Sequence, residues 1–165
     1  MRAPAVLVAF ASETGSTARI AEEIAKVLCA AGIGVETRLA AEVESLAPYR
    51  ALVLGSGVFV RSRHADGGGF LTRHAAELAG MPVWLYCSGP IGRYRGAGLP
   101  PTDSASTVVE VARAIGARGA EAFGCGGVAG VDSDLAEPVD MVRVRGWARE
   151  IARDLVAGAR EVVTA

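Results

Sequence analysis

Hydroxyl side chains surround a glycine in a short segment that follows the first apolar run of the chain. Ser12, Thr14, Ser16 and Thr17 flank Gly15, immediately before the periodic apolar pattern of a helix. Amides at a helix N-terminus have no intrahelical acceptor, and the helix dipole is positive there, so an anion is attracted to this point. The segment therefore predicts an anion cradle with phosphate as its natural occupant. A plain helix cap, for which one hydroxyl suffices, is the alternative.

Other chemistries find little support in the residue pattern. The segment contains no lysine, so the GxxxxGK[ST] pattern of nucleotide triphosphate hydrolysis is absent, as is the dinucleotide pattern GxGxxG. Cys29, Cys87 and Cys125 are widely spaced, without a CxxC pair or a histidine at metal-ligand spacing. Neither a disulfide framework nor a metal site is predicted, and a reducing cytoplasm suits these cysteines best. No catalytic triad or carboxylate pair stands out, so no catalytic acid, base or nucleophile is predicted.

Length and composition predict one compact domain covering residues 1–165. The chain is 51% apolar and carries a formal net charge of -1. Such a chain can bury a core without disulfides, and its charge indicates neither nucleic acid nor an anionic membrane as a partner. No run approaches the roughly 20 apolar residues of a membrane-spanning helix, and the apolar run after Met1 is too short for a signal peptide.

Five short apolar runs alternate with helical patterns along the chain. The predicted strands are Ala5–Phe10, Val35–Leu39, Ala51–Gly55, Val83–Cys87 and Ala120–Gly124. Apolar stripes predict helices around residues 20–28, 68–78, 108–115 and 144–155, and the crossover after Leu39 is long enough for only a turn or two of helix. Strand and helix in alternation predict the α/β class, with a single doubly wound five-stranded parallel sheet covered by helices on both faces.

Several buried positions follow from these stripes. Val108, Val111, Ala112 and Ile115 form one stripe, and Val144, Trp147, Ile151 and Leu155 form another. Trp84, Trp147 and Cys87 are predicted core residues, and His74 is predicted to have a structural role within its helix.

The loops that follow the first, third and fourth strands are the expected ligand-binding loops. Open α/β sheets bind ligands outside the carboxyl ends of the strands, where the strand order reverses. The second of these loops begins with GSGVFV at residue 55 and the third with SGPIG at residue 88. Gly57 lacks a Cβ and can turn its carbonyl toward a ligand, although a simple strand-to-loop turn explains the same glycines.

The segment VLVAFASETGSTARIAEEIA resembles the phosphate-loop signature of the flavodoxin family. ALVLGSGVFV and VWLYCSGPIG are similar to the two loops with which that family holds the flavin ring. The resemblance implies the strand order 2-1-3-4-5 and FMN as the cofactor. It is closest to the flavodoxin-domain proteins related to menaquinone-dependent protoporphyrinogen IX dehydrogenase, which implies an FMN-dependent oxidoreductase.

The resemblance also implies a set of cofactor-binding residues. The phosphate would be held by Ser12, Glu13 through its backbone, Thr14, Gly15, Ser16 and Thr17. The flavin ring would be lined on one side by Ser56, Gly57, Val58, Phe59 and Val60, and on the other by Ser88, Gly89, Pro90, Ile91 and Gly92. Many flavodoxins place a Trp and a Tyr against the ring, whereas these loops offer Phe59 and, further on, Tyr94. Weaker retention of FMN is therefore expected.

Basic side chains concentrate in the loops expected to rim the flavin. They are Arg61, Arg63, His64, Arg93 and Arg95. Guanidinium groups bind carboxylates and phosphates, so the cluster predicts an anionic molecule beside the flavin, such as the propionates of a porphyrin, the phosphates of a reduced nicotinamide or an acidic protein surface; a solvated basic loop is the alternative. Together with the family resemblance, this leads us to expect a small anionic or quinone-type electron acceptor. Three functions remain open: an oxidoreductase with a small-molecule or redox-protein donor and acceptor, a pure electron carrier, and a non-catalytic module that binds a phosphate ligand. The sequence carries no indication of oligomeric state.

Overall fold

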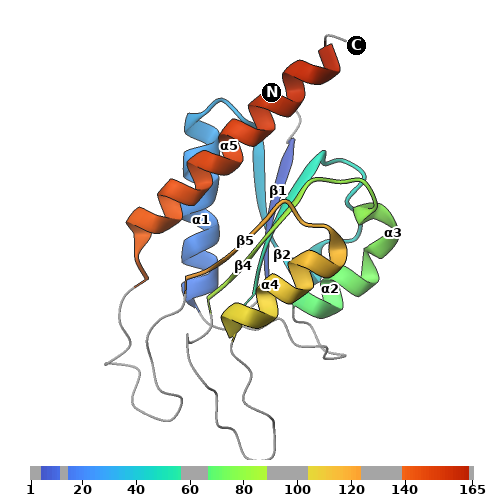
Figure 1. Cartoon of the computed structure of the whole chain (residues 1–165), viewed down its shortest axis with the longest axis vertical. Coiled ribbons are helices and arrows are strands. Elements are labelled where there is room, and N and C mark those ends of the chain that lie inside the picture. The colour runs from blue at the N-terminus through green and yellow to red at the C-terminus, as the bar shows by residue number, and fades with distance from the viewer. Residues whose placement is uncertain (1–4, 12–14, 57–66, 89–103, 124–138, 164–165) are drawn as a thin grey trace, which may run out of the picture.

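The computed structural model describes residues 5–11, 15–56, 67–88, 104–123 and 139–163, in which strands and helices alternate (Figure 1). The strands are β1 (Val6–Ala11), β2 (Val35–Leu39), β3 (Ala51–Ser56), β4 (Val83–Cys87) and β5 (Gly119–Ala122). The helices are α1 (Gly15–Ala30), the 3-10 helix η1 (Ala40–Glu42), α2 (Gly67–Arg73), α3 (Ala75–Leu78), α4 (Ser104–Ile115) and α5 (Met141–Val163).

The strands form one parallel sheet in the order β2-β1-β3-β4-β5, which confirms the predicted fold class. Four strands lie within one residue of the predicted runs. The prediction for β5 was displaced, since the strand begins at Gly119 and ends at Ala122. A Cβ on Gly119 would lie 2.9 Å from the Trp84 ring of the neighbouring strand, so a glycine fits this first position of β5.

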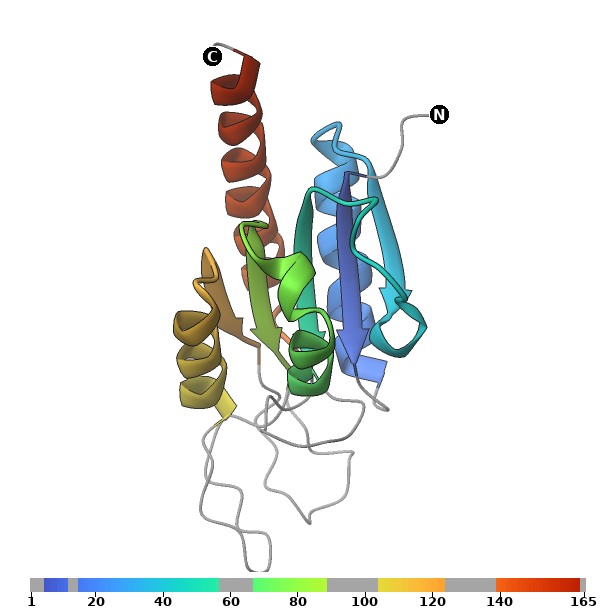
Figure 2. The same cartoon turned by 90° about the vertical axis from the view of Figure 1, so that its right-hand side faces the viewer.

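Helices cover both faces of the sheet. Helices α1 and α5 pack on one face, and α2, α3 and α4 on the other (Figures 1 and 2). Successive side chains of a strand point to opposite faces, so β1 contributes Val6 and Val8 to the core under α1 and α5, and Leu7 and Ala9 to the other core. Burial on both faces explains the nearly unbroken apolar composition of β1, β3 and β4.

The predicted helix over residues 68–78 is interrupted at His74. The backbone dihedrals of His74, φ -106° and ψ 17°, lie outside the helical region, so α2 ends at Arg73 and α3 begins at Ala75. The side chain is buried, packs on the Phe70 ring at 4.5 Å between centroids, and has Nδ1 2.9 Å from Glu77 Oε1. The predicted structural role is confirmed. The break was not predicted because no proline marks this position in the sequence.

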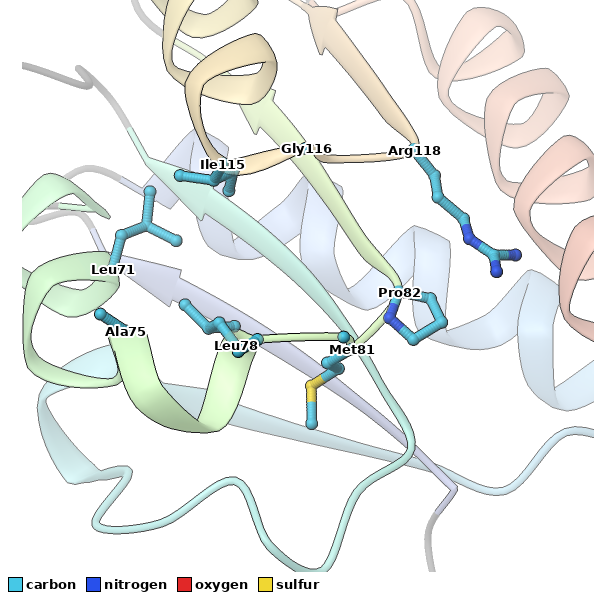
Figure 3. Close-up of a pocket in the computed structure, with 10 residues that line it drawn as sticks. Leu71, Ala75, Leu78, Met81, Pro82, Ile115, Gly116 and Arg118 are labelled. Carbon is cyan, nitrogen blue, oxygen red and sulfur yellow. The ribbon is translucent and has the colours of Figure 1, made fainter.

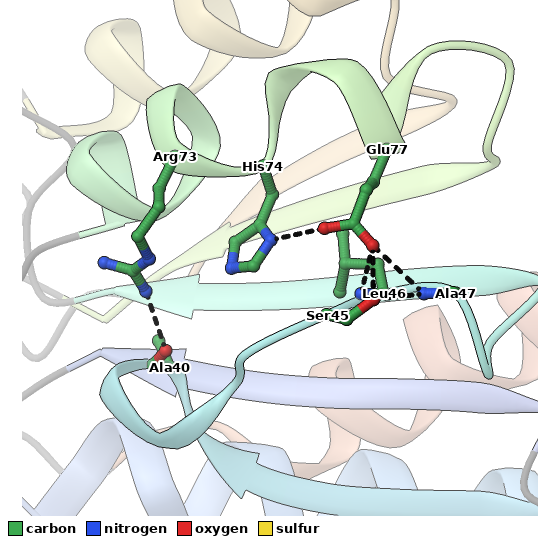
Figure 4. Close-up of polar contacts among 7 residues, drawn as sticks. All are labelled: Ala40, Ser45, Leu46, Ala47, Arg73, His74 and Glu77. Carbon is green, nitrogen blue, oxygen red and sulfur yellow. Dashed lines mark hydrogen bonds and ion pairs between the residues drawn. The ribbon is translucent and has the colours of Figure 1, made fainter.

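A carboxylate joins α3 to the chain that follows η1 (Figure 4). Glu77 Oε2 accepts hydrogen bonds from the Ser45 hydroxyl at 2.6 Å and from the amides of Leu46 and Ala47 at 2.7 and 3.1 Å. Ser45, His74 and the Leu46 amide stabilise its charged form and lower the pKa of Glu77 to about 2. These hydrogen bonds attach the second crossover to α3. The crossover contains a single 3-10 turn, as expected from its length.

The apolar stripe of α5 is buried as predicted, but that of α4 is only partly buried. Val108 and Ala112 belong to the core, whereas Ile115 is 40% exposed. Ile115 is the last residue of α4, and the chain turns away at Gly116, whose φ is +67°. The apolar stripe of α4 extends to Ile115, but the packed side chains that cover Val108 and Ala112 do not extend that far.

Candidate functional site

Three of the strands end side by side at the carboxyl edge of the sheet. The parallel register pairs Ala11 of β1 with Ser56 of β3, and Ser56 with Cys87 of β4. The Ser88 amide donates to the Ser56 carbonyl at 3.0 Å and continues the pairing one residue beyond β4. The three loops expected from the sequence to hold a ligand therefore start at adjacent positions, below the arrowheads in Figure 2.

The N-terminus of α1 lies at this same edge of the sheet. The helix begins at Gly15, four residues after β1 ends, and its first turn contains no acidic side chain. The amides of this turn have no intrahelical acceptor, and the helix dipole favours an anion. An ideal Cβ on Gly15 would meet no atom within 4 Å, so the space beside the Gly15 Cα is open. An anionic group such as a phosphate fits this position.

Gly15 adopts a backbone conformation that is open to any residue. Among the described glycines only Gly32, Gly80 and Gly116 have positive φ. Gly15 is simply the first residue of α1, and the space beside its Cα is open.

Thr17 connects the first turn of α1 to the end of β4. Its side chain is completely buried and its hydroxyl oxygen is hydrogen bonded to the Ser88 hydroxyl. Its carbonyl oxygen accepts a hydrogen bond from the Tyr86 hydroxyl at 2.8 Å. Ser56 and Ser88 are also buried, with 1% and 5% of their surface exposed. Thr17, Ser88 and the Tyr86 hydroxyl thus form a polar cluster at the carboxyl edge of the sheet, and the Ser88 amide joins it to the Ser56 carbonyl.

Tyr86 and Gly55 pack together at the carboxyl edge of the sheet, and the sequence analysis did not single them out. The Tyr86 ring passes over Gly55, where an ideal Cβ would lie only 1.9 Å from Tyr86 Cζ. The ring packs against Phe123 and Trp147, each at 6.3 Å between centroids. Burial raises the pKa of Tyr86, which keeps the phenol protonated as the donor to Thr17. The available signal was a tyrosine in an otherwise apolar strand, because a buried phenol needs a partner.

The structure describes five of the predicted site residues and brings them to one edge of the sheet. They are Gly15, Ser16, Thr17, Ser56 and Ser88. The remaining predicted cofactor-binding residues lie outside the described residues: Ser12, Glu13, Thr14, Gly57, Val58, Phe59, Val60, Gly89, Pro90, Ile91 and Gly92. The predicted basic rim, namely Arg61, Arg63, His64, Arg93 and Arg95, also lies outside them. These assignments stay predictions.

A separate groove of about 380 Å³ lies at the opposite end of the strands, between α3 and the end of α4 (Figure 3). Leu71, Leu78 and Ile115 project into it, while the Arg118 side chain extends away from them. The Arg118 guanidinium instead lies over the Trp84 ring, 5.9 Å from its centroid. The groove is lined by both polar and apolar surface, and none of the five predicted site residues that the structure describes lines it.

The described part of the chain offers neither a metal site nor a membrane-spanning helix. No group of three histidine, cysteine, aspartate or glutamate residues there is arranged to hold a metal ion. Nor do those residues include a helix with the length and apolar character required to cross a bilayer.

Solved structures similar to this one include flavodoxins and larger proteins. Flavodoxin from Megasphaera elsdenii is 21% identical with a TM-score of 0.57, over 90% of this chain and 98% of its own. Rubredoxin oxygen:oxidoreductase from Desulfovibrio gigas is 17% identical with a TM-score of 0.63; the match covers 93% of this chain but 36% of that one. The Flv1 flavodiiron core from Synechocystis is 17% identical with a TM-score of 0.64, and the match covers 94% of this chain but 37% of that one. The chain thus spans about a third of the two larger proteins, and these likenesses establish the flavodoxin-like fold.

The sequence itself matches a family profile. The profile of the flavodoxin domain aligns with residues 7–111, which run from β1 through most of α4. The chain belongs to this flavodoxin domain family. A search of curated proteins returned no match.

Proposed function

We propose that this protein binds FMN at the carboxyl edge of its sheet and transfers electrons through it. The observation that carries the proposal is the convergence of α1 with the ends of β3 and β4, in a chain of the flavodoxin domain family. When bound, FMN supplies reversible uptake of one or two electrons. The open space at Gly15 and the absence of acidic side chains in the first turn of α1 suit its phosphate.

The roles of the individual residues follow from the three loops. The amides of Gly15, Ser16 and Thr17, together with Ser12, Glu13 and Thr14, hold the phosphate. The flavin ring lies between the loops that begin after Ser56 and at Ser88. Ser56 and Ser88 are buried, and the Ser88 amide donates to the Ser56 carbonyl, which fixes the two points of the sheet from which these loops start.

The acceptor class is a finer proposal. We infer an oxidoreductase that passes electrons to a small anionic or quinone-type acceptor, as the resemblance to protoporphyrinogen dehydrogenase-related proteins implies. The support is the nearly neutral net charge of -1 combined with five basic residues in the two predicted ring loops. A carrier that docks to basic partners benefits from a strongly acidic surface, which this composition does not provide. Steady turnover with a small donor and acceptor, without a protein partner, distinguishes the oxidoreductase from the carrier.

A titration of the apo-protein with FMN tests the proposal. Binding should shift the visible flavin bands and quench flavin fluorescence. Ser16→Asp should abolish this binding, because it places a carboxylate where the phosphate would lie. The same substitution should preserve stability, since an acidic residue in the first turn of a helix interacts favourably with the dipole. Val142→Asp, in the first turn of α5, is the matched control and should retain FMN binding. Unchanged FMN affinity in Ser16→Asp would contradict the proposed phosphate position.

A further inference from the structure

Strand β2 is the outermost strand of the sheet, and within the described residues no strand pairs with its outer edge (Figure 2). The Gly34 carbonyl accepts from the Val6 amide at 3.1 Å, so the backbone groups of Gly34 face β1. These groups alternate in direction along a strand, and alternate residues of β2 therefore face the free edge, namely Val35, Thr37 and Leu39. Such a row of donors and acceptors can pair with a strand of another chain.

The sequence of β2, VETRL, is complementary to itself when it is read in the opposite direction. About Thr37 as the centre, Val35 stands opposite Leu39, and Glu36 stands opposite Arg38. Antiparallel pairing with the β2 of a second copy would thus place each carboxylate across from a guanidinium and each apolar side chain across from another. The same centre sets the outward-facing residues directly opposite one another, where an antiparallel pair exchanges both backbone hydrogen bonds.

The two charged side chains of β2 are accessible for this pairing. Glu36 and Arg38 lie on the same face of the strand and are bonded to each other, and Glu36 also accepts from the Tyr49 hydroxyl at 2.7 Å. Their side chains are 30% and 47% exposed, so a second copy can reach both. Parallel pairing in register would instead oppose like charges, so the charge pattern favours the antiparallel direction.

The flank of α1 beside this free edge carries small residues. Helix α1 covers β1 and β2, and Glu23 lies on its flank toward α5, where it is bonded to Arg145 at 2.5 Å. Because a helix has about 3.6 residues per turn, Ala25 lies on the opposite flank together with Ala18. A two-fold axis perpendicular to the sheet would bring this flank toward the α1 of the second copy, and small side chains leave room for that approach.

We propose that the protein forms a symmetric dimer through antiparallel pairing of β2 with the β2 of a second copy, which joins the two sheets into one. The two-fold axis passes beside Thr37, and both copies contribute the same residues to the interface. The proposal is independent of the proposed FMN site, because β1 separates β2 from β3 and β4.

Sedimentation velocity over a series of protein concentrations tests the dimer. The wild type should form a species of twice the 16.9 kDa monomer mass. Glu36→Arg alone and Arg38→Glu alone each set like charges opposite one another, so either should weaken self-association at least about tenfold. An equimolar mixture of these two variants should recover the dimer, because arginines of one chain then face glutamates of the other. Glu121→Arg, which reverses a charge on the opposite edge strand β5, is the matched control and should dimerise like the wild type.

Thr37→Pro tests the backbone pairing. The Thr37 amide faces the free edge, so proline removes no hydrogen bond to β1 and is tolerated there. Circular dichroism should show a folded protein, and sedimentation should show a monomer; Thr37→Val, which keeps the amide, should still dimerise. If Thr37→Pro does not fold, the mixture of charge variants decides alone. A wild type that stays monomeric at about 1 mM would overturn the proposal, as would a dimer that persists in both single charge variants.

Discussion

Gly55→Ala tests whether the carboxyl edge of the sheet depends on the close approach of Tyr86 to the β3 backbone. The added Cβ would lie 1.9 Å from Tyr86 Cζ and 2.2 Å from its hydroxyl oxygen, far inside van der Waals contact. The ring cannot move away from the added Cβ, because Phe123 and Trp147 pack against it and its hydroxyl is bonded to Thr17. We expect a loss of about 3 kcal/mol in the free energy of unfolding, the upper part of the overpacking range.

Chemical denaturation followed by circular dichroism measures this loss, and a second substitution tests its cause. Tyr86→Leu removes the ring and should by itself cost about 3 kcal/mol through the cavity it leaves. In the double variant the alanine Cβ occupies space vacated by the ring. The combined loss should therefore be about 2 kcal/mol smaller than the sum of the single losses.

Gly146→Ala is the matched control for the glycine substitution. Its Cβ would meet no atom within 4 Å, and Gly146 lies inside α5. Alanine there should raise stability by about 0.5–1 kcal/mol, because glycine is a poor helix former. The clash argument is refuted if Gly55→Ala costs less than about 1 kcal/mol, or if its loss adds fully to that of Tyr86→Leu.

Two further predictions concern the other face of the molecule. The lowered pKa of Glu77, about 2 against an ordinary 4.5, means that its stabilising contribution is present above pH 4.5 and is lost as the pH falls toward 2. Glu77→Gln should therefore flatten the pH dependence of unfolding in this window, and exposed Glu22→Gln should not; identical pH profiles for wild type and Glu77→Gln would contradict the assignment. On α4, Val108→Ala should cost about 2 kcal/mol because Val108 is fully buried, whereas Ile115→Ala should cost no more than about 0.5 kcal/mol. Equal losses in denaturation would mean that the end of α4 is covered.

Local patterns in the sequence were enough to predict the architecture. Apolar runs without polar alternation identified strands buried on both faces, and stripes at helical spacing identified α1, α4 and α5. The α/β alternation then indicated a doubly wound sheet, and the family resemblance supplied its order. The same reasoning placed Gly15, Ser16, Thr17, Ser56 and Ser88 at one edge, because carboxyl ends of parallel strands meet there.

These local patterns did not predict contacts between residues far apart in the sequence. Three contacts join segments at least thirty residues apart: the hydrogen bond between Thr17 and Ser88, the packing of Tyr86 over Gly55, and the hydrogen bonds of Glu77 with residues 45–47. The sequence by itself determined which segments form strands and helices, since periodicity and chain turns are local properties. The tertiary structure alone decided which hydroxyl is buried and which glycine is sterically required, because both depend on side chains brought together only when the sheet and its helices pack.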